Sequence, residues 1–180
     1  GSSGAIVIRS GSATSGASGS LSVVLGSGRY GPGGRISISG GESTTKTGGA
    51  ISLVTGYGST TSSGAFSIRS GNAGSHGVSG SLTFTSGTSN GGGSGVILIR
   101  TGNATSGAGG SLSIVVGSGD SSAGGRLTMS AGESTSLTGG SVSLISGFGS
   151  ISSSGSFSIR TASAGDTGVS GALSFSTGTT

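Results

Sequence analysis

The stretches GAIVIRSG (residues 4–11) and GVILIRTG (residues 95–102) are almost the same sequence, placed 91 residues apart. Shorter versions of this pattern lie between them, such as GSLSVVLG (19–26) and GAISLVTG (49–56). Self-similarity at a fixed period is the sequence signature of a repeat architecture. The period therefore decides how the rest of the chain is interpreted.

Twelve short units make up the chain, and each begins with glycine. Positions 3 and 5 of a unit are apolar, position 8 is glycine in every unit except at Ala162, and a polar stretch follows. The units begin at Gly4, Gly19, Gly34, Gly49, Gly64, Gly80, Gly95, Gly110, Gly125, Gly140, Gly155 and Gly171. Six units form one long repeat, so we divide the chain into 1–91 and 92–180. We expect the two repeats to form one continuous, uncapped array that belongs to a longer one.

The apolar positions alternate with polar ones, which indicates β-strands rather than helices. Glycine at this density is also costly inside a helix. Glycine reaches left-handed backbone conformations without steric cost, so the chain can turn at the same place in every unit. Equal turns after equal strands predict an all-β fold, a parallel β-solenoid (β-helix) in which each strand stacks on the previous one. If two units form one coil of that fold, Ile6 and Ile8 pack across a thin core against Leu21 and Val23.

The number of units in one coil is left open between two arrangements. Position 6 is Arg or Ser in odd units and mostly Val or Ile in even units. We favour a two-unit coil of about 30 residues, with one strand from an odd unit and one from an even unit. At ~4.8 Å per coil, the two-unit coil gives an axial rise of roughly 29 Å, against roughly 58 Å for a coil of one unit.

Position 6 points away from the predicted core, because side chains alternate across a strand. The even units therefore place a row of apolar side chains on the outside, and contiguous exposed apolar surface usually marks an interface. The alternative is a set of tolerated surface valines. The predicted interface residues are Val24, Val54, Val115 and Ile145.

The composition limits the classes of function. Charged residues make up 7% of the chain and there is one proline, whereas disordered chains are rich in both. The net charge is +4, but the arginines are spread singly, so the clustered cations of a nucleic-acid interface are missing. No apolar run is long enough to span a bilayer.

We predict no catalytic, cofactor-binding or metal-binding residue, and hence no enzyme activity and no cofactor. His76 is the only histidine, and its counterpart in the second repeat is Thr167. The chain has four acidic residues, and the repeated Gly-Gly-x-Gly-x-Asp motif of calcium-binding β-rolls is missing. No Gly-Lys-Ser or Gly-Lys-Thr phosphate loop is present.

The stretches GGRISISGGESTTKTGGAISLVTG (33–56) and GSLSIVVGSGDSSAGGRLTMSAGES (110–134) resemble the Ser/Gly-rich β-solenoid repeats of large extracellular surface or filament proteins of microbes, algae and other protists. The resemblance covers the whole chain and carries over no functional residue. It implies a structural protein, outside the cell or on its surface, that forms a fibre, an appendage or a cell coat. The expected partner is the chain itself, with glycans as a further partner class. The alternative is a binding module, either an ice-binding solenoid or a carbohydrate or surface adhesin.

Overall fold

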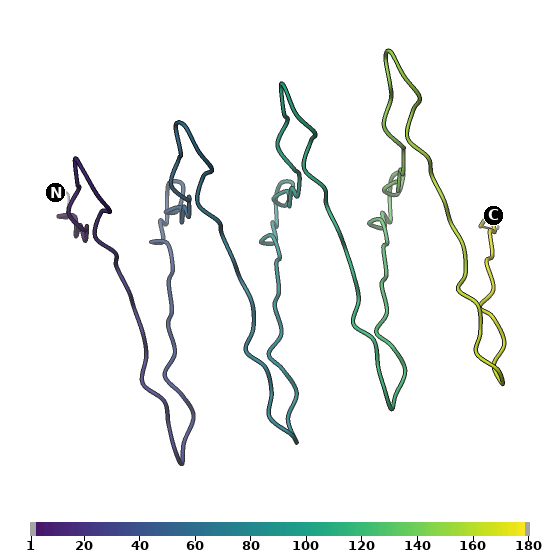
Figure 1. Cartoon of the computed structure of the whole chain (residues 1–180), viewed down its shortest axis with the longest axis horizontal. Coiled ribbons are helices and arrows are strands. Elements are labelled where there is room, and N and C mark those ends of the chain that lie inside the picture. The colour runs from purple at the N-terminus through teal and green to yellow at the C-terminus, as the bar shows by residue number, and fades with distance from the viewer. Residues whose placement is uncertain (1–2, 179–180) are drawn as a thin grey trace. The chain divides into compact units, whose positions relative to one another are not determined.

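The structure, a computed structural model, describes residues 3–178. Within that range the chain forms no helix and no strand. Straight, extended stretches alternate with bends at which the chain changes direction (Figure 1). The bends recur once per unit, at 14–16, 29–31, 44–46, 59–61, 75–76, 90–92, 105–107, 120–122, 135–137, 150–152 and 166–167. Each bend lies in the polar half of a unit.

Several of these bends sit in loops that are closed at their base by one backbone hydrogen bond. The N–H of the first glycine of a unit donates to the carbonyl oxygen at position 8 of the unit before it. The nitrogen to oxygen distance is 2.8 Å between Gly49 and Gly41, and 3.0 Å between Gly64 and Gly56. The same bond joins Gly125 to Gly117, Gly140 to Gly132 and Gly155 to Gly147, at 3.0, 2.9 and 2.9 Å. We call each such base the neck of its loop.

Close approach of the two loop ends explains the glycine that begins a unit at Gly34, Gly49 and Gly125. A Cβ added at the first glycine would lie against the residue at position 7 of the preceding unit. It would be 3.2 Å from the Cβ of Leu25 at Gly34, and 2.5 Å from Cγ1 of Val116 at Gly125. At Gly49 it would be 2.9 Å from the backbone nitrogen of Gly41, a contact that real Cβ atoms do not make. Glycine is needed here because the two ends of the loop approach each other closely.

No residue of the described range is buried, so this part of the chain has no hydrophobic core. Almost every residue is exposed, and the four half-buried ones all lie in or beside loops: Thr55, Gly58, Ala131 and Gly149. The accessible surface is 17970 Å² for a chain of 16.4 kDa. A compact monomer of that mass exposes roughly 7,500 Å² and a fully extended chain roughly 24,000 Å². The chain is therefore ordered locally at its loops and remains open between them.

The prediction of a parallel β-solenoid is wrong for this chain. Its packing required Ile6 and Ile8 to be covered by Leu21 and Val23, but these side chains are 93%, 75%, 67% and 67% exposed. The two-unit coil and the one-unit coil both fail with it, because each needs adjacent strands that the described residues do not form. The alternation of polar and apolar residues specifies which side chains share a face. It does not specify which segment of the chain, or of another chain, lies beside them.

The role assigned to the turn glycines also needs correction. Among residues 3–178 the only glycine with a positive φ is Gly16, at 119°. The others have ordinary backbone angles. Some of them are required by close approach in the loops, as at Gly149, where a Cβ would lie 2.6 Å from the carbonyl oxygen of Ser152, whereas the glycines at position 8 have open space around an added Cβ.

At a larger scale than the twelve units, the chain divides into two compact parts, one ending at Ile97 and the other beginning at Leu98. Each consists of the same alternation of extended segments and loops. Across the described range there is no helix that could cross a membrane.

Candidate functional site

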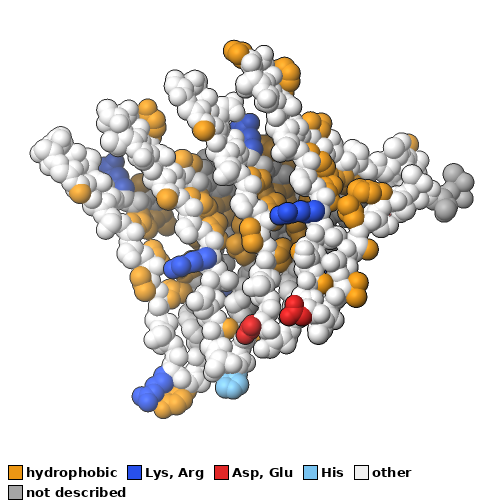
Figure 2. All heavy atoms as spheres, turned by 45° about the vertical axis from the view of Figure 1, so that its right-hand side comes forward, with side chains coloured by type: hydrophobic (Ala, Val, Ile, Leu, Met, Phe, Trp, Pro, Cys, Tyr) orange, Lys and Arg blue, Asp and Glu red, His pale blue; other side chains and the backbone are white. Residues whose placement is uncertain are grey.

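The extended segments present the most distinctive surface of this chain. Positions 3 and 5, which the sequence assigns to a core, lie at the surface instead (Figure 2). In the segment 49–56, Ile51 is 52% exposed and Leu53 is 68% exposed. The corresponding residues of the second repeat, Val142 and Leu144, are 56% and 58% exposed. A row of apolar side chains thus recurs on one face of every segment.

The backbone of the same segments is also open. All backbone hydrogen bonds within residues 3–178 lie in the loops or at their necks. The extended stretches between the necks, in that range, therefore carry N–H and C=O groups without a protein partner. Such stretches pair readily with another extended chain. Each segment combines an apolar face with a free hydrogen-bonding edge.

The four predicted interface residues lie on these segments and are among their most exposed side chains. Val24 is 84% exposed, Val54 89%, Val115 85% and Ile145 88%. Since positions 3 and 5 are exposed as well, these four residues belong to a larger apolar surface than the sequence suggested. In the four segments that carry Val24, Val54, Val115 and Ile145, both faces offer apolar contacts.

The loops carry most of the side-chain hydrogen bonds. The Ser43 hydroxyl accepts the N–H of Lys46 at 3.0 Å, and the equivalent Ser134 accepts that of Leu137 at 2.9 Å. The same loop geometry therefore forms in both long repeats although a lysine in one is a leucine in the other. Sequence reasoning missed these contacts, but a signal existed. Serine stands directly after a glutamate in both loops, at Glu42 and Glu133.

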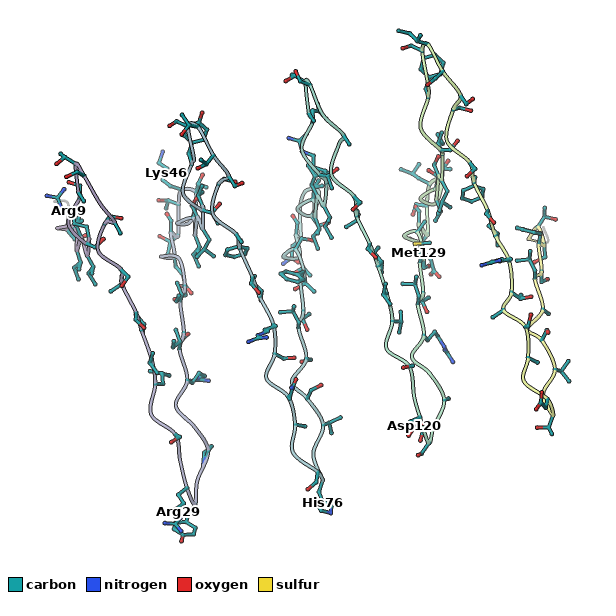
Figure 3. The ribbon with its side chains drawn as sticks, viewed as in Figure 1. Arg9, Arg29, Lys46, His76, Asp120 and Met129 are labelled. Atoms are coloured by element: carbon teal, nitrogen blue, oxygen red, sulfur yellow. The ribbon has the colours of Figure 1, made fainter. Side chains whose placement is uncertain are left out.

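The charged side chains are single and lie apart. Arg29, His76 and Asp120 each lie at the tip of a loop (Figure 3). The guanidinium of Arg29 stacks over the ring of Tyr30, 5.4 Å from its centroid. The His76 ring contacts the Ser75 hydroxyl, with 3.0 Å between Nδ1 and Oγ. Ser75 and His76 are adjacent residues of one exposed loop. A serine nucleophile with a histidine base also needs a third group that orients the base.

Shallow hollows recur at the end of extended segments that carry an arginine at position 6, where the loop begins. One is lined by Arg69, Ser70, Gly71 and Asn72, and its counterpart in the second repeat by Arg160, Thr161, Ala162 and Ser163. Each hollow is formed by consecutive residues of one bend. The described residues hold no group of three or more histidine, cysteine or acidic side chains that could bind a metal ion.

Comparisons of the chain with protein-family models, with curated proteins and with solved structures find no match. The function is therefore argued from the chain's own surface.

Proposed function

We propose that this chain is a structural subunit of an extracellular fibre, surface appendage or cell coat, and that it acquires its packed structure by assembling with copies of itself. The observation that carries this proposal is the exposed apolar row, repeated on twelve segments with nothing in the described range to cover it. Soluble monomers rarely expose contiguous apolar surface on this scale.

The size of the open surface supports assembly. The chain exposes about 10,000 Å² more than a compact monomer of its mass. Obligate interfaces bury about 2,000 to 5,000 Å² or more. The open surface of one chain is therefore large enough for several such interfaces. A fibre subunit needs this, because neighbours contact it on more than one side.

The composition supports a structural role and favours no other class. With 7% charged residues and single, separated arginines, the segments present little charge to oppose close packing of copies. The loops keep Ser, Thr and Gly at the surface. A fibre built this way has a polar exterior contributed by loops and an interior contributed by positions 3 and 5.

The test is a concentration series of the purified chain, followed by light scattering, circular dichroism and electron microscopy. We expect weak secondary structure below a threshold concentration, and filaments with a β-type spectrum above it. A chain that stays monomeric and without β structure at millimolar concentration would refute the proposal.

A further inference from the structure

We infer that the partner of each extended segment is the neighbouring unit of a second copy, so that adjacent copies lie parallel and displaced by one unit. This inference rests on the proposed self-assembly and specifies its register. The pairing is between chains, and each copy keeps the open conformation described above.

The repeat period indicates that the partner is a second copy. The segments are separated by loops of nearly constant length, and five of these loops are closed by a neck. A copy displaced by a whole number of units therefore presents a segment to a segment and a loop to a loop along its entire length. A partner without this period could match one segment only.

The direction of pairing follows from the position of the apolar residues. Residues that lie opposite one another in paired strands project from the same face. In a parallel arrangement, positions 3 and 5 of one copy meet positions 3 and 5 of the other. In an antiparallel arrangement with the loops aligned, position 3 meets position 6, so in every odd-numbered segment the Arg or Ser at position 6 would share a face with the apolar row of the other copy. Parallel pairing keeps one face apolar.

The arginines select the displacement. Like charges directly opposite each other destabilise a strand pair. With no displacement, each arginine at position 6 lies beside the same arginine of the next copy. A displacement of two units brings Arg69 beside Arg100, and one of four units brings Arg9 beside Arg69. A displacement of six units brings Arg9 beside Arg100.

A displacement of one unit places no arginine beside another. Arg69 then lies between Val54 and Thr85, and Arg160 lies between Ile145 and Ser176. Displacements of three or five units also separate the arginines, but they pair fewer segments. One unit leaves eleven of the twelve segments paired, since 12 − 1 = 11, against nine for three units. It therefore gives the largest contact area without charge repulsion.

A constant displacement makes the contact head-to-tail, and contacts of this type grow into open filaments rather than closed rings. This is the assembly that a fibre subunit needs. The register thus links the spacing of four arginines to the form of the assembly.

Cysteine cross-linking tests the register, because the chain has no cysteine of its own. Position 6 is Ser39 in the third unit, Val54 in the fourth and Thr85 in the sixth. Chains carrying S39C and chains carrying V54C are assembled separately and as an equal mixture, then oxidised in air. A mixture of S39C and T85C chains is the matched control for a three-unit displacement.

We expect at least tenfold more disulfide-linked dimer in the mixture of S39C and V54C chains than in either chain alone or in the control mixture. Equal or greater cross-linking of S39C chains alone would overturn the inference in favour of unshifted copies. Dominant cross-linking of S39C to T85C would also overturn it. The inference would also be overturned if the chains assemble but no sample forms disulfide-linked dimers. Light scattering of the unmodified chain separates these failures from a failure of the proposed assembly itself.

Discussion

The loop at 41–49 and the segment that follows it, 50–55, show two different sources of order. The loop is tied by the bond between Gly49 and Gly41, and the Ser43 hydroxyl supports its bend. The segment has no backbone hydrogen bond to any other segment of the described range, and its apolar side chains Ile51 and Leu53 are open to solvent. The hydrogen bonds of the loop are made within the loop itself, whereas the backbone groups and apolar side chains of the segment have no partner in the described range. Changes to segments should therefore act on assembly, and changes to loops should act locally.

The largest effect is expected from placing charge on the apolar row. The double variant I51D/L53D removes two side chains that assembly would bury, each worth about 2 kcal/mol. The threshold concentration for assembly should rise by more than about 100-fold, as measured by light scattering. The control T60D/T61D adds the same charge to a loop and should shift the threshold by less than about threefold. Equal effects of the two variants would contradict the division between loops and segments.

A smaller effect is expected at the predicted interface residues on the opposite face. The double variant V54K/V115K should abolish lateral association of filaments, because it places charge on two side chains that are more than 80% exposed. It should also raise the assembly threshold, because the register inferred above sets these lysines beside Arg69 and Arg100 of the next copy. The chain's loops should keep their amide spectra. Electron microscopy measures the width of the filaments, and S52K/S113K, on the same face, is the control. Bundles of unchanged width in V54K/V115K would show that Val54 and Val115 are tolerated surface residues.

A local effect is expected at the neck. In G49A the new Cβ meets the backbone of Gly41, so the loop must open and the bond between the two glycines is lost. A net hydrogen bond of about 1 kcal/mol slows amide exchange about fivefold, and this protection at residue 49 should disappear. The matched control is G41A, on the other side of the same neck, where a Cβ would meet nothing within 4 Å. Retained protection in G49A would mean that the neck adapts to a side chain.

The smallest effect is expected from the loop hydroxyls. In S134A the N–H of Leu137 loses its acceptor, which at an exposed site costs about 0.5 kcal/mol. Exchange of that amide should become about twofold faster in monomeric chain, and assembly should be unaffected. S136A removes a neighbouring hydroxyl from the same loop and serves as the control. A rise in the assembly threshold of S134A would show that loop order is coupled to the segments.

The sequence was sufficient for the local features and insufficient for the packing. The glycines at the start of each unit and the polar stretches after position 8 correctly locate the bends, because a turn depends on residues that are near in sequence. The alternation at Ile36 and Ile38 predicted a β-strand, and the chain there is not helical but forms no strand. The alternation fails to identify a partner, since an apolar face can be covered by the same chain or by another. The half-buried Thr55 and Ala131 were missed because their contacts depend on how closely the loop ends approach.

Two loops without a neck have a consequence for variation in loop length. Two units, 64–79 and 155–170, carry one extra residue, and their loops bend through short turns in which Gly77 donates to Gly74 and Gly168 to Gly165. The additional residue lies in the loop, after position 8, and the residues on either side form no helix or strand, as in the other units of the described range. A foreign peptide inserted at the tip of one of these loops should therefore be displayed on the surface of the assembled fibre. These loops are suitable insertion sites for giving a fibre new binding properties.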